Sequence, residues 1–470
     1  MRFFTLFLSF AGLLFSHSLV VAQSPYVSKI WDYQPAPGQY INTAIGGPYA
    51  AQSLSGGISG SLSLGAFGGY VVLGFDHRIM NDPDNPYGVD FTVFGNATAL
   101  SAEPAAVYVM RDNNNNGLPD DTWYLLAGSD YYFSTSDAAY EITYAFAEAG
   151  EDVPWTDKQG NTGFVLQNEF HLQAYYPLAD SFPSIPQDEY VLSGLKIEAR
   201  LNSQDEAYIT SNPYPFGFAD NKPRVLSASH LEPDNPYTAA LEGGGGDAFD
   251  ISWAVDANGL PVALDGIDFI KVQTAVNASA GWLGELSAEI LGVVDVAPDA
   301  TVSGESRRVV LQPFFKALEP EQSTQVQAFV FEAGKPLDNP VFEFTSADNA
   351  VASIGGDGLL SSYKAGSVWI FATWEGTYRD SLLVEVKHPL GFAETAELSL
   401  MLYPNPAVSQ VSVQGAESCN LLSLSDVWGR TYELSPLGTN SWDVSRLSPG
   451  IYWLTLLANN QVLTLQLIKQ

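Results

Sequence analysis

The chain has 470 residues, of which 46% are hydrophobic and 13% aromatic, and it contains 41 Gly and 28 Pro. Its 20 basic and 53 acidic residues give a formal net charge of −33, which argues against binding to nucleic acid or anionic lipid, because both need clustered Lys and Arg. The only cysteine, Cys419, excludes an intrachain disulfide. Together these values favour several β-rich domains and exclude a disordered acidic chain.

The first 22 residues are typical of a signal peptide. Arg2 precedes an almost wholly apolar run over 3–21, and small residues lead up to Gln23. We expect cleavage after Ala22 and no transmembrane span in the mature chain, with an uncleaved anchor helix as the alternative.

Residues 24–300 are predicted to form a two-sheet, jelly-roll-like β-sandwich. Short apolar runs such as 69–75, 90–94 and 267–273 are separated by Gly, Pro, Asn and Asp, a spacing typical of sandwich strands. The sequence Pro-Asp-Asn-Pro-Tyr occurs at 83–87 and again at 233–237. We interpret both copies as tight turns, and the alternative is a pair of loops that line a site at one end of the sandwich.

The stretch RDNNNNGLPDDTW, residues 111–123, has the pattern of a calcium loop. Oxygen-bearing side chains stand at alternate positions, and a glycine permits the sharp turn between them. The twelfth position holds Trp123 where an EF-hand has a bidentate Glu, and the flanking residues alternate as strands do. We therefore expect structural calcium on a β-hairpin, with a metal-free polar turn as the alternative. The expected ligands are Asp112, Asn114, Asn116, Leu118 and Asp120.

No catalytic motif stands out in the sequence, and we assign no catalytic residue. Glu285 and Glu289, which lie beside Trp282, are the best carboxylate candidates for glycan hydrolysis, and the alternative is a polar strand edge near the sandwich rim. Several aromatic residues are expected to be exposed and could stack on sugar rings, with a place in the sandwich core as the alternative: Trp123, Tyr124, Tyr131, Tyr132, Trp155, Tyr175 and Tyr176.

Local sequences in 88–96, 109–124, 264–272 and 281–285 resemble a group of Bacteroidetes cell-surface proteins. This resemblance covers most of residues 60–295. It implies a β-sandwich at the cell surface but no particular ligand.

Residues 305–388 are predicted to form an Ig-like sandwich, because short strands and turns follow one another at that spacing. The motif at 346–354, followed by Gly358-Leu359, Ala365-Gly366 and 370–372, resembles the bacterial Ig-like domain of group 2. That resemblance implies a spacer or adhesive module.

Residues 395–470 are predicted to form a small β-sandwich. Three motifs occur in order: Tyr-Pro-Asn-Pro-Ala at 403–407, Asp-Val-Trp-Gly-Arg at 426–430 and Leu-Ser-Pro-Gly-Ile-Tyr at 447–452. The set resembles the type A C-terminal sorting domain of the type IX secretion system. It implies that the type IX machinery is a partner, that the tail is removed, and that the protein is released or attached to the cell surface.

These features predict a secreted or outer-membrane-surface protein that is not an enzyme and that binds a glycan or another extracellular ligand. Two alternatives stay open at this point. One is a secreted carboxylate-dependent glycan hydrolase or lyase, and the other is a structural adhesin.

Overall fold

The computed structural model describes residues 23–82, 88–98, 100–205, 208–222, 245–297, 307–387, 400–415, 418–426, 430–458 and 461–470. The expected signal peptide and both Pro-Asp-Asn-Pro-Tyr motifs lie outside the described residues. The chain divides into two compact units, 1–388 and 389–470. As predicted, the fold is all-β: in the described part, helical structure is limited to four 3-10 segments of three to five residues. These are η1 (Ala50–Leu54), η2 (Ser129–Tyr132), η3 (Ile251–Trp253) and η4 (Gly281–Leu283).

The first domain has an antiparallel six-stranded sheet at its centre. In spatial order its strands are β1 (Lys29–Gln34), β3 (Tyr70–Met80), β15 (Gly266–Thr274), β5 (Ala105–Met110), β6 (Trp123–Leu126) and β14 (Ala254–Val255). A second sheet consists of β13 (Gly245–Phe249), β4 (Phe91–Gly95), β16 (Glu289–Asp295) and β2 (Leu62–Ser63). Alternate side chains of the two sheets, among them Val71, Val93 and Ile270, form the main core between them, as the strand period of two requires.

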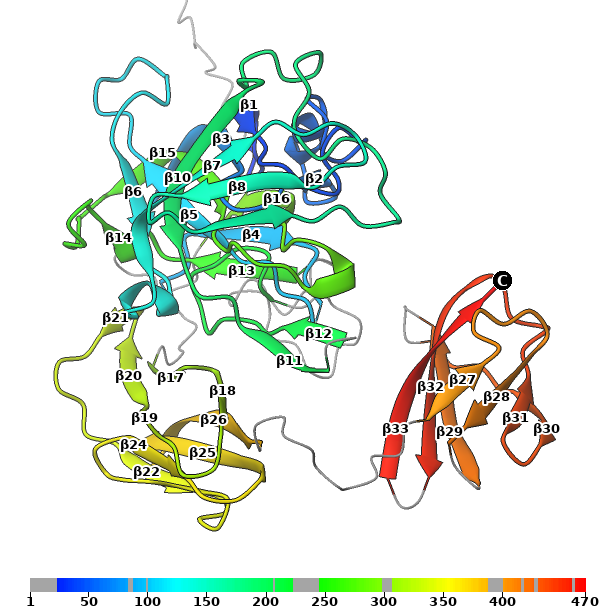
Figure 1. Cartoon of the computed structure of the whole chain (residues 1–470). Coiled ribbons are helices and arrows are strands. Elements are labelled where there is room, and N and C mark those ends of the chain that lie inside the picture. The colour runs from blue at the N-terminus through cyan, green and yellow to red at the C-terminus, as the bar shows by residue number, and fades with distance from the viewer. Residues whose placement is uncertain are drawn as a thin grey trace, which may run out of the picture. The chain divides into compact units, whose positions relative to one another are not determined.

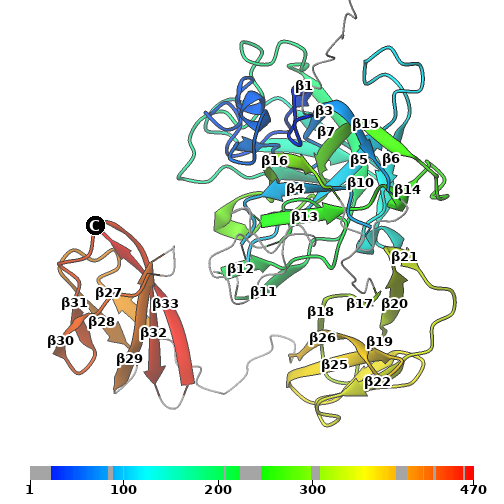
Figure 2. The same cartoon turned by 180° about the vertical axis from the view of Figure 1, so that it is seen from behind.

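A third sheet covers part of the opposite face of the six-stranded sheet, where the sequence predicted only two sheets. It consists of β10 (Glu189–Lys196), β7 (Asp137–Ala145), β8 (Val153–Asp157) and β9 (Thr162–Val165), and the hairpin β11 (Leu201–Asp205) and β12 (Tyr208–Ser211) follows β10. The third layer forms because β7 buries Tyr140, Ile142 and Tyr144 in a second core. In Figure 1 the strands β7, β8 and β10 face the viewer, and in Figure 2 the strands β4, β13 and β16 do.

Residues 307–387 form a second sandwich with its own core around Val330, Ile370 and Val384. Its sheets are β17 (Arg307–Gln312), β20 (Gln327–Glu332) and β21 (Lys335–Pro336); β18 (Phe315–Leu318), β26 (Tyr378–Val386), β25 (Gly366–Trp374) and β22 (Glu343–Ser346); and β19 (Ser323–Gln325), β24 (Leu359–Ser362) and β23 (Ala352–Ile354). We call this part the Ig-like module.

The first domain and the Ig-like module meet in an apolar contact that we call the seam. Its buried residues are Phe133, Val310 and Phe331, and Tyr132, Phe216 and Phe329 pack around them. Two hydrogen bonds cross the seam, from the Trp253 indole to the Ala333 carbonyl at 3.0 Å and from the Gln312 amide to the Thr135 hydroxyl at 2.8 Å. Apolar burial combined with hydrogen bonds fixes two modules more firmly than a flexible linker does.

Beside the seam lies a buried ion pair. The Arg200 guanidinium donates to both oxygens of the Asp130 carboxylate at 3.0 Å, and both side chains are less than a tenth exposed. The guanidinium also stacks over the Tyr214 ring and over Phe314 of the Ig-like module. This pair therefore ties the first domain to the module next to it.

The second unit, described by itself, is a small sandwich. One sheet consists of β27 (Met401–Tyr403), β28 (Gln410–Gln414), β31 (Ser441–Asp443) and β30 (Ser435–Gly438), and the other of β29 (Cys419–Asp426), β32 (Gly450–Ala458) and β33 (Gln461–Lys469). Asn405 of the first tail motif accepts a hydrogen bond from the Ile468 N–H and donates to the Gln466 carbonyl, both at 2.8 Å. The first motif is thereby fixed to the last strand.

Candidate functional site

The loop predicted to bind calcium joins β5 to β6, which pair as an antiparallel hairpin as the sequence indicated. One oxygen of the Asp112 carboxylate accepts the Asn116 N–H at 3.2 Å, and the other accepts the Gly117 N–H at 2.7 Å. Gly117 has a φ of 72°, a conformation that a residue with a Cβ rarely adopts. The turn is therefore built around a buried carboxylate and a glycine.

The other predicted ligands gather on the exposed side of this turn. The amide nitrogens of Asn114 and Asn116 lie 3.1 and 2.9 Å from oxygens of the Asp120 carboxylate, and the Leu118 N–H donates to Asn116 Oδ1 at 2.8 Å. The side chains of Asn114, Asn116 and Asp120 thus lie within hydrogen-bond distance of one another, while the Asp112 carboxylate binds backbone N–H groups of the same turn.

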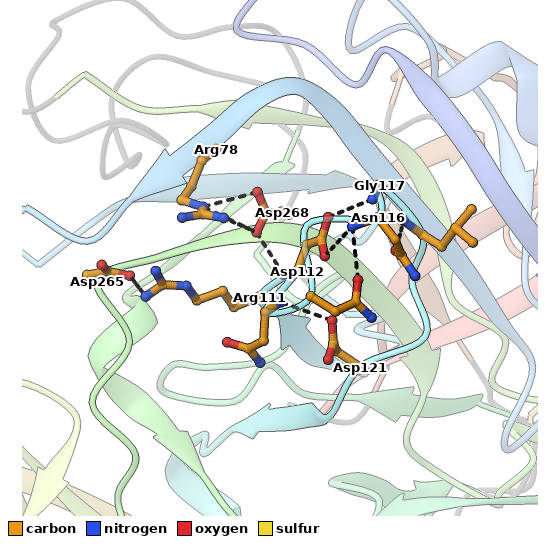
Figure 3. A network of polar contacts seen from close by, with 11 residues as sticks. Arg78, Arg111, Asp112, Asn116, Gly117, Asp121, Asp265 and Asp268 are labelled. Atoms are coloured by element: carbon orange, nitrogen blue, oxygen red, sulfur yellow. Dashed lines mark hydrogen bonds and ion pairs between the residues drawn. The ribbon is translucent and has the colours of Figure 1, made fainter.

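An ion-pair network holds the base of this loop, as Figure 3 shows. The Asp268 carboxylate of β15 accepts the Asp112 N–H at 2.8 Å, and Arg78 of β3 binds the same carboxylate at 2.9 Å. Arg111, the first residue of the loop, pairs with Asp265, which directly precedes β15. Two strands of the central sheet thus fix where the loop begins.

Next to the loop lies a groove of about 440 Å³, a size within the usual range for small-molecule sites. It lies where β10 of the third sheet crosses the face of the central sheet that this third sheet covers in part, and Pro119 of the loop is among its lining residues. Its lining residues come from β1, β3, β6, β10, β15 and that loop: Asp32, Gln34, Tyr70, Val72, Pro119, Trp123, Tyr190, Val191, Leu192, Ser193, Lys271 and Gln273.

Two polar atoms of the groove lining have no hydrogen-bond partner among the described residues. They are the Tyr190 hydroxyl and Gln273 Oε1, both on side chains that are at least nine-tenths buried. Burying such a group without a partner costs about 1–3 kcal/mol. The Gln273 amide nitrogen is satisfied, because it donates to the Gly68 and Ser193 carbonyls at 2.7 and 3.1 Å. The free atoms are therefore well placed to bind a polar ligand.

The groove also contains a cation, Lys271. Its ammonium nitrogen lies 4.2 Å from the centre of the Tyr108 ring, 5.5 Å from that of Trp123 and 5.6 Å from that of Tyr70. Burial lowers the pKa of Lys271 from 10.5 to about 8, so the side chain is mostly protonated at neutral pH. Sequence reasoning missed this residue, because a lysine within an apolar strand gives no sign of what the opposing layer places near it.

A separate cluster of carboxylates lies deep in the first domain. Oxygens of Glu103, Asp220 and Glu289 all lie within 4.8 Å of one another. Asp220 accepts the N–H groups of Asn96, Ala97 and Glu289 at 2.7–2.8 Å. Burial and mutual repulsion raise the pKa of Glu103 and of Asp220, and burial raises the pKa of Glu289. Three carboxyls this close hold at least one proton among them.

Glu285 lies near this cluster and is itself buried. One of its oxygens accepts the Gln39 N–H at 2.6 Å, while the other has no partner within the described part of the chain. Burial raises the pKa of Glu285 to about 8. The alternative of a polar rim for Glu285 and Glu289 is wrong, because both are at least 95% buried. Their buried partners Glu103 and Asp220 come from distant segments that no sequence spacing connects.

The candidate aromatic residues fall into four groups. Trp123 lines the groove. Tyr175 and Tyr176 are almost fully buried in the second core, so the expectation that they are exposed is wrong. Tyr131 and Tyr132 pack on each other close to the seam. Tyr124 and Trp155 are partly buried against the first and second cores.

Comparisons with known proteins identify the tail. Residues 401–470 match the family model of the secretion system C-terminal sorting domain, so the chain is exported by the type IX route to the cell surface or the medium. No helix among the described residues is long and apolar enough to cross a membrane. A search of curated proteins gave no match.

Solved structures similar to this chain are β-sandwich proteins. Domains 5–6 of the S-layer protein SbsC are 11% identical and cover 34% of this chain and 97% of their own, with a TM-score of 0.16. Extracellular domains 3–5 of Drosophila OTK are 10% identical and cover 84% and 99%, with a TM-score of 0.16. A Bacteroides ovatus protein of the mixed-linkage glucan utilization locus, SGBP-B with a bound heptasaccharide, is 15% identical and covers 45% and 58%, with a TM-score of 0.12. Scores this low carry no argument about the ligand of this chain.

Proposed function

We propose that the exported protein is a surface or secreted binding protein whose first domain holds a saccharide in the groove beside the loop 111–123. The observation that carries this proposal is the lining of the groove. A partly exposed indole, Trp123, faces a space in which two buried polar atoms, on Tyr190 and Gln273, lack partners. Stacking surfaces combined with a few fixed polar groups are what sugar rings bind.

In this proposal the Ig-like module is of the group 2 type and acts as a spacer. Residues 1–22 direct the chain to the periplasm, and the sorting tail then directs it through the type IX machinery.

Replacing Trp123 with alanine is expected to weaken saccharide binding at least tenfold, because truncating a Trp that anchors a binding site commonly costs about 2 kcal/mol or more. A glycan array probed with the purified exported protein would identify a ligand, and titration calorimetry would compare the variants. Trp369 of the Ig-like module is 44% exposed and distant from the groove lining, so Trp369→Ala is the matched control. Equal affinity of the Trp123→Ala variant and the native protein would contradict the proposal.

The loop 111–123 is proposed to hold a structural calcium ion through Asp112, Asn114, Asn116, Asp120 and the Leu118 carbonyl. Calcium takes six to eight oxygen ligands at 2.3–2.6 Å, and water would complete this set. By fixing Pro119 and the start of β6, the ion would shape the rim of the groove.

Chelation is expected to lower the melting temperature of the first domain by several degrees, because an ion bound only by the folded state stabilises that state by mass action. In the Asp120→Asn variant this dependence on calcium should largely disappear. Asp120 is the best position for the test, because it is exposed and its carboxylate accepts hydrogen bonds from the Asn114 and Asn116 amides within the loop. Differential scanning calorimetry with and without calcium measures the effect, and Asp180→Asn is the exposed control. A chelator effect of equal size in Asp120→Asn would remove the metal from this loop.

One observation favours a second candidate function, glycan hydrolysis. The cluster of Glu103, Asp220 and Glu289 brings together carboxyls whose pKa values are raised, and glycosidases use a pair of carboxyls of which one is protonated. Release of reducing ends from polysaccharides that is lost in Glu289→Gln would support this function. Blank results in both binding and turnover assays, together with self-association, would instead support the structural adhesin.

A further inference from the structure

We propose that the groove binds an acidic saccharide, whose carboxylate lies against the ammonium group of Lys271. This inference rests on the saccharide-binding function proposed above. It adds the chemical class of the ligand, which the aromatic lining by itself leaves open.

The position of Lys271 within the sheet is the first step. Lys271 lies on β15, near the middle of the central sheet, directly across from Val72 on β3 and Tyr108 on β5. Its neighbours two positions away on the same face are Phe269 and Gln273, which are at most 5% exposed. Lys271 therefore carries its charge at a largely apolar surface of the sheet. Burying an ammonium group at such a surface costs several kcal/mol of folding free energy unless the group is paired.

The absence of a counter-ion is the second step. Among the described residues, no carboxylate forms an ion pair with Lys271, and burial is the sole cause that moves its pKa. Three aromatic rings surround the ammonium, and cation–π contacts offset part of the cost of burial. They bring no negative charge, so the site keeps an unneutralised cation that faces the groove.

Asp32 is the one carboxylate in the groove lining, and its hydrogen bonds direct it elsewhere. It accepts the Tyr70 hydroxyl at 3.0 Å and the Gln34 amide at 2.9 Å. Tyr70 and Gln34 therefore hold this carboxylate in place, and it forms no ion pair with Lys271 in the described structure. A ligand that brings its own carboxylate would supply the missing charge.

The neutral partners in the groove indicate the remainder of the ligand. The Tyr190 hydroxyl can donate or accept a hydrogen bond, and Gln273 Oε1 can accept one. Together with the Trp123 indole, these groups suit a ring that carries hydroxyls on its edge and an apolar face. A sugar acid such as a uronate combines this ring with the carboxylate that Lys271 lacks.

Titration calorimetry with tetrasaccharides from galacturonan, alginate and hyaluronan tests the proposal, with each oligosaccharide compared with its carboxyl-reduced counterpart. Ionic strength is held near 0.15 M, where a Debye length of about 8 Å screens the remote acidic residues. We expect at least one acidic oligosaccharide to bind the exported protein at least tenfold more tightly than its reduced form. Lys271→Met should lose this preference, so that the acidic and the reduced form bind with similar affinity, whereas Lys271→Arg should keep part of it.

The pH dependence gives a second readout. Affinity for the acidic ligand should fall between pH 7 and pH 9.5 as Lys271 loses its proton, while affinity for the reduced ligand should stay constant. The other titratable groups around the ammonium are Asp32, Tyr70, Tyr108 and Tyr190. Burial raises the pKa values of the three tyrosines, so their hydroxyls keep their protons over this pH range. The melting temperature of Lys271→Met shows that the variant is folded.

Three outcomes separate this inference from the function on which it rests. Equal binding of acidic and reduced forms, lost in Trp123→Ala, would overturn the acidic ligand and keep the saccharide site. A preference for the acidic form that persists in Lys271→Met would also overturn the inference, because a residue other than Lys271 would then bind the ligand carboxylate. Failure of every saccharide to bind would overturn both.

Discussion

Replacing Arg200 with methionine is expected to lower the free energy of unfolding of the first unit by about 3–5 kcal/mol, the usual loss when one partner of a buried ion pair is removed. The reason is that Asp130 would stay buried without the two bonds at 3.0 Å that it now accepts from Arg200. The guanidinium also lies over the Tyr214 and Phe314 rings, so packing is lost with the charge. Denaturant titration followed by Trp fluorescence measures the change.

Two further variants define what this result means. Lys364→Met removes an exposed ammonium group from the Ig-like module and should cost less than about 0.5 kcal/mol. The double variant Arg200→Met and Asp130→Leu removes both charges and should recover part of the loss, since an apolar pair of similar volume is often tolerated. A single Arg200→Met variant as stable as the native protein would show that the ion pair does not hold the seam.

The stability of the first domain is expected to fall as the pH rises from about 4.5 to about 8, because of the buried Glu285. Its pKa is raised in the folded state, so the unfolded chain releases this proton first, and alkaline conditions favour unfolding. The full contribution of Glu285 is present below pH 4.5 and is lost as the pH passes 8. The shift from 4.5 to about 8 corresponds to roughly 4–5 kcal/mol.

Glu285→Gln isolates this contribution. Glu103, Asp220 and Glu289 change stability in the same direction, so the native protein and the variant must be compared over one pH series. We expect the free energy of unfolding of the variant to depend less steeply on pH between 5 and 8, whatever its absolute value. Parallel curves would show that Glu285 is ionised in the folded protein.

The sequence predicted features that a short stretch of chain determines by itself. Alternating oxygens and one glycine determine the turn around Asp112 and Gly117, and the structure has that turn on the predicted hairpin. Motifs in the tail likewise identify the sorting domain, which the family match confirms. Alternation of apolar residues predicted the all-β class for the same reason.

Sites that are formed by residues from distant segments of the chain could not be predicted from the sequence. Lys271, Tyr190 and Asp32 meet only because β10 crosses the face of the sheet that contains β1 and β15, and no spacing along the chain encodes that crossing. The same holds for Glu103, Asp220 and Glu289, which lie more than 60 residues apart. For Tyr175 and Tyr176 the sequence prediction was wrong in another way. Exposure was expected, but both side chains are buried in the second core.

The seam has a mechanical consequence for any ligand held by the first domain. Phe133, Val310 and Phe331 pack across this contact, so the first domain and the Ig-like module should tumble in solution as one body. A ligand bound by the first domain would then keep a fixed orientation relative to the Ig-like module. A force applied to that ligand would act on the packed aromatic side chains of the seam and not on a flexible hinge. Ligand binding would also restrict no motion between these two domains. The conformational entropy that a receptor with a flexible hinge loses on binding is therefore not lost here.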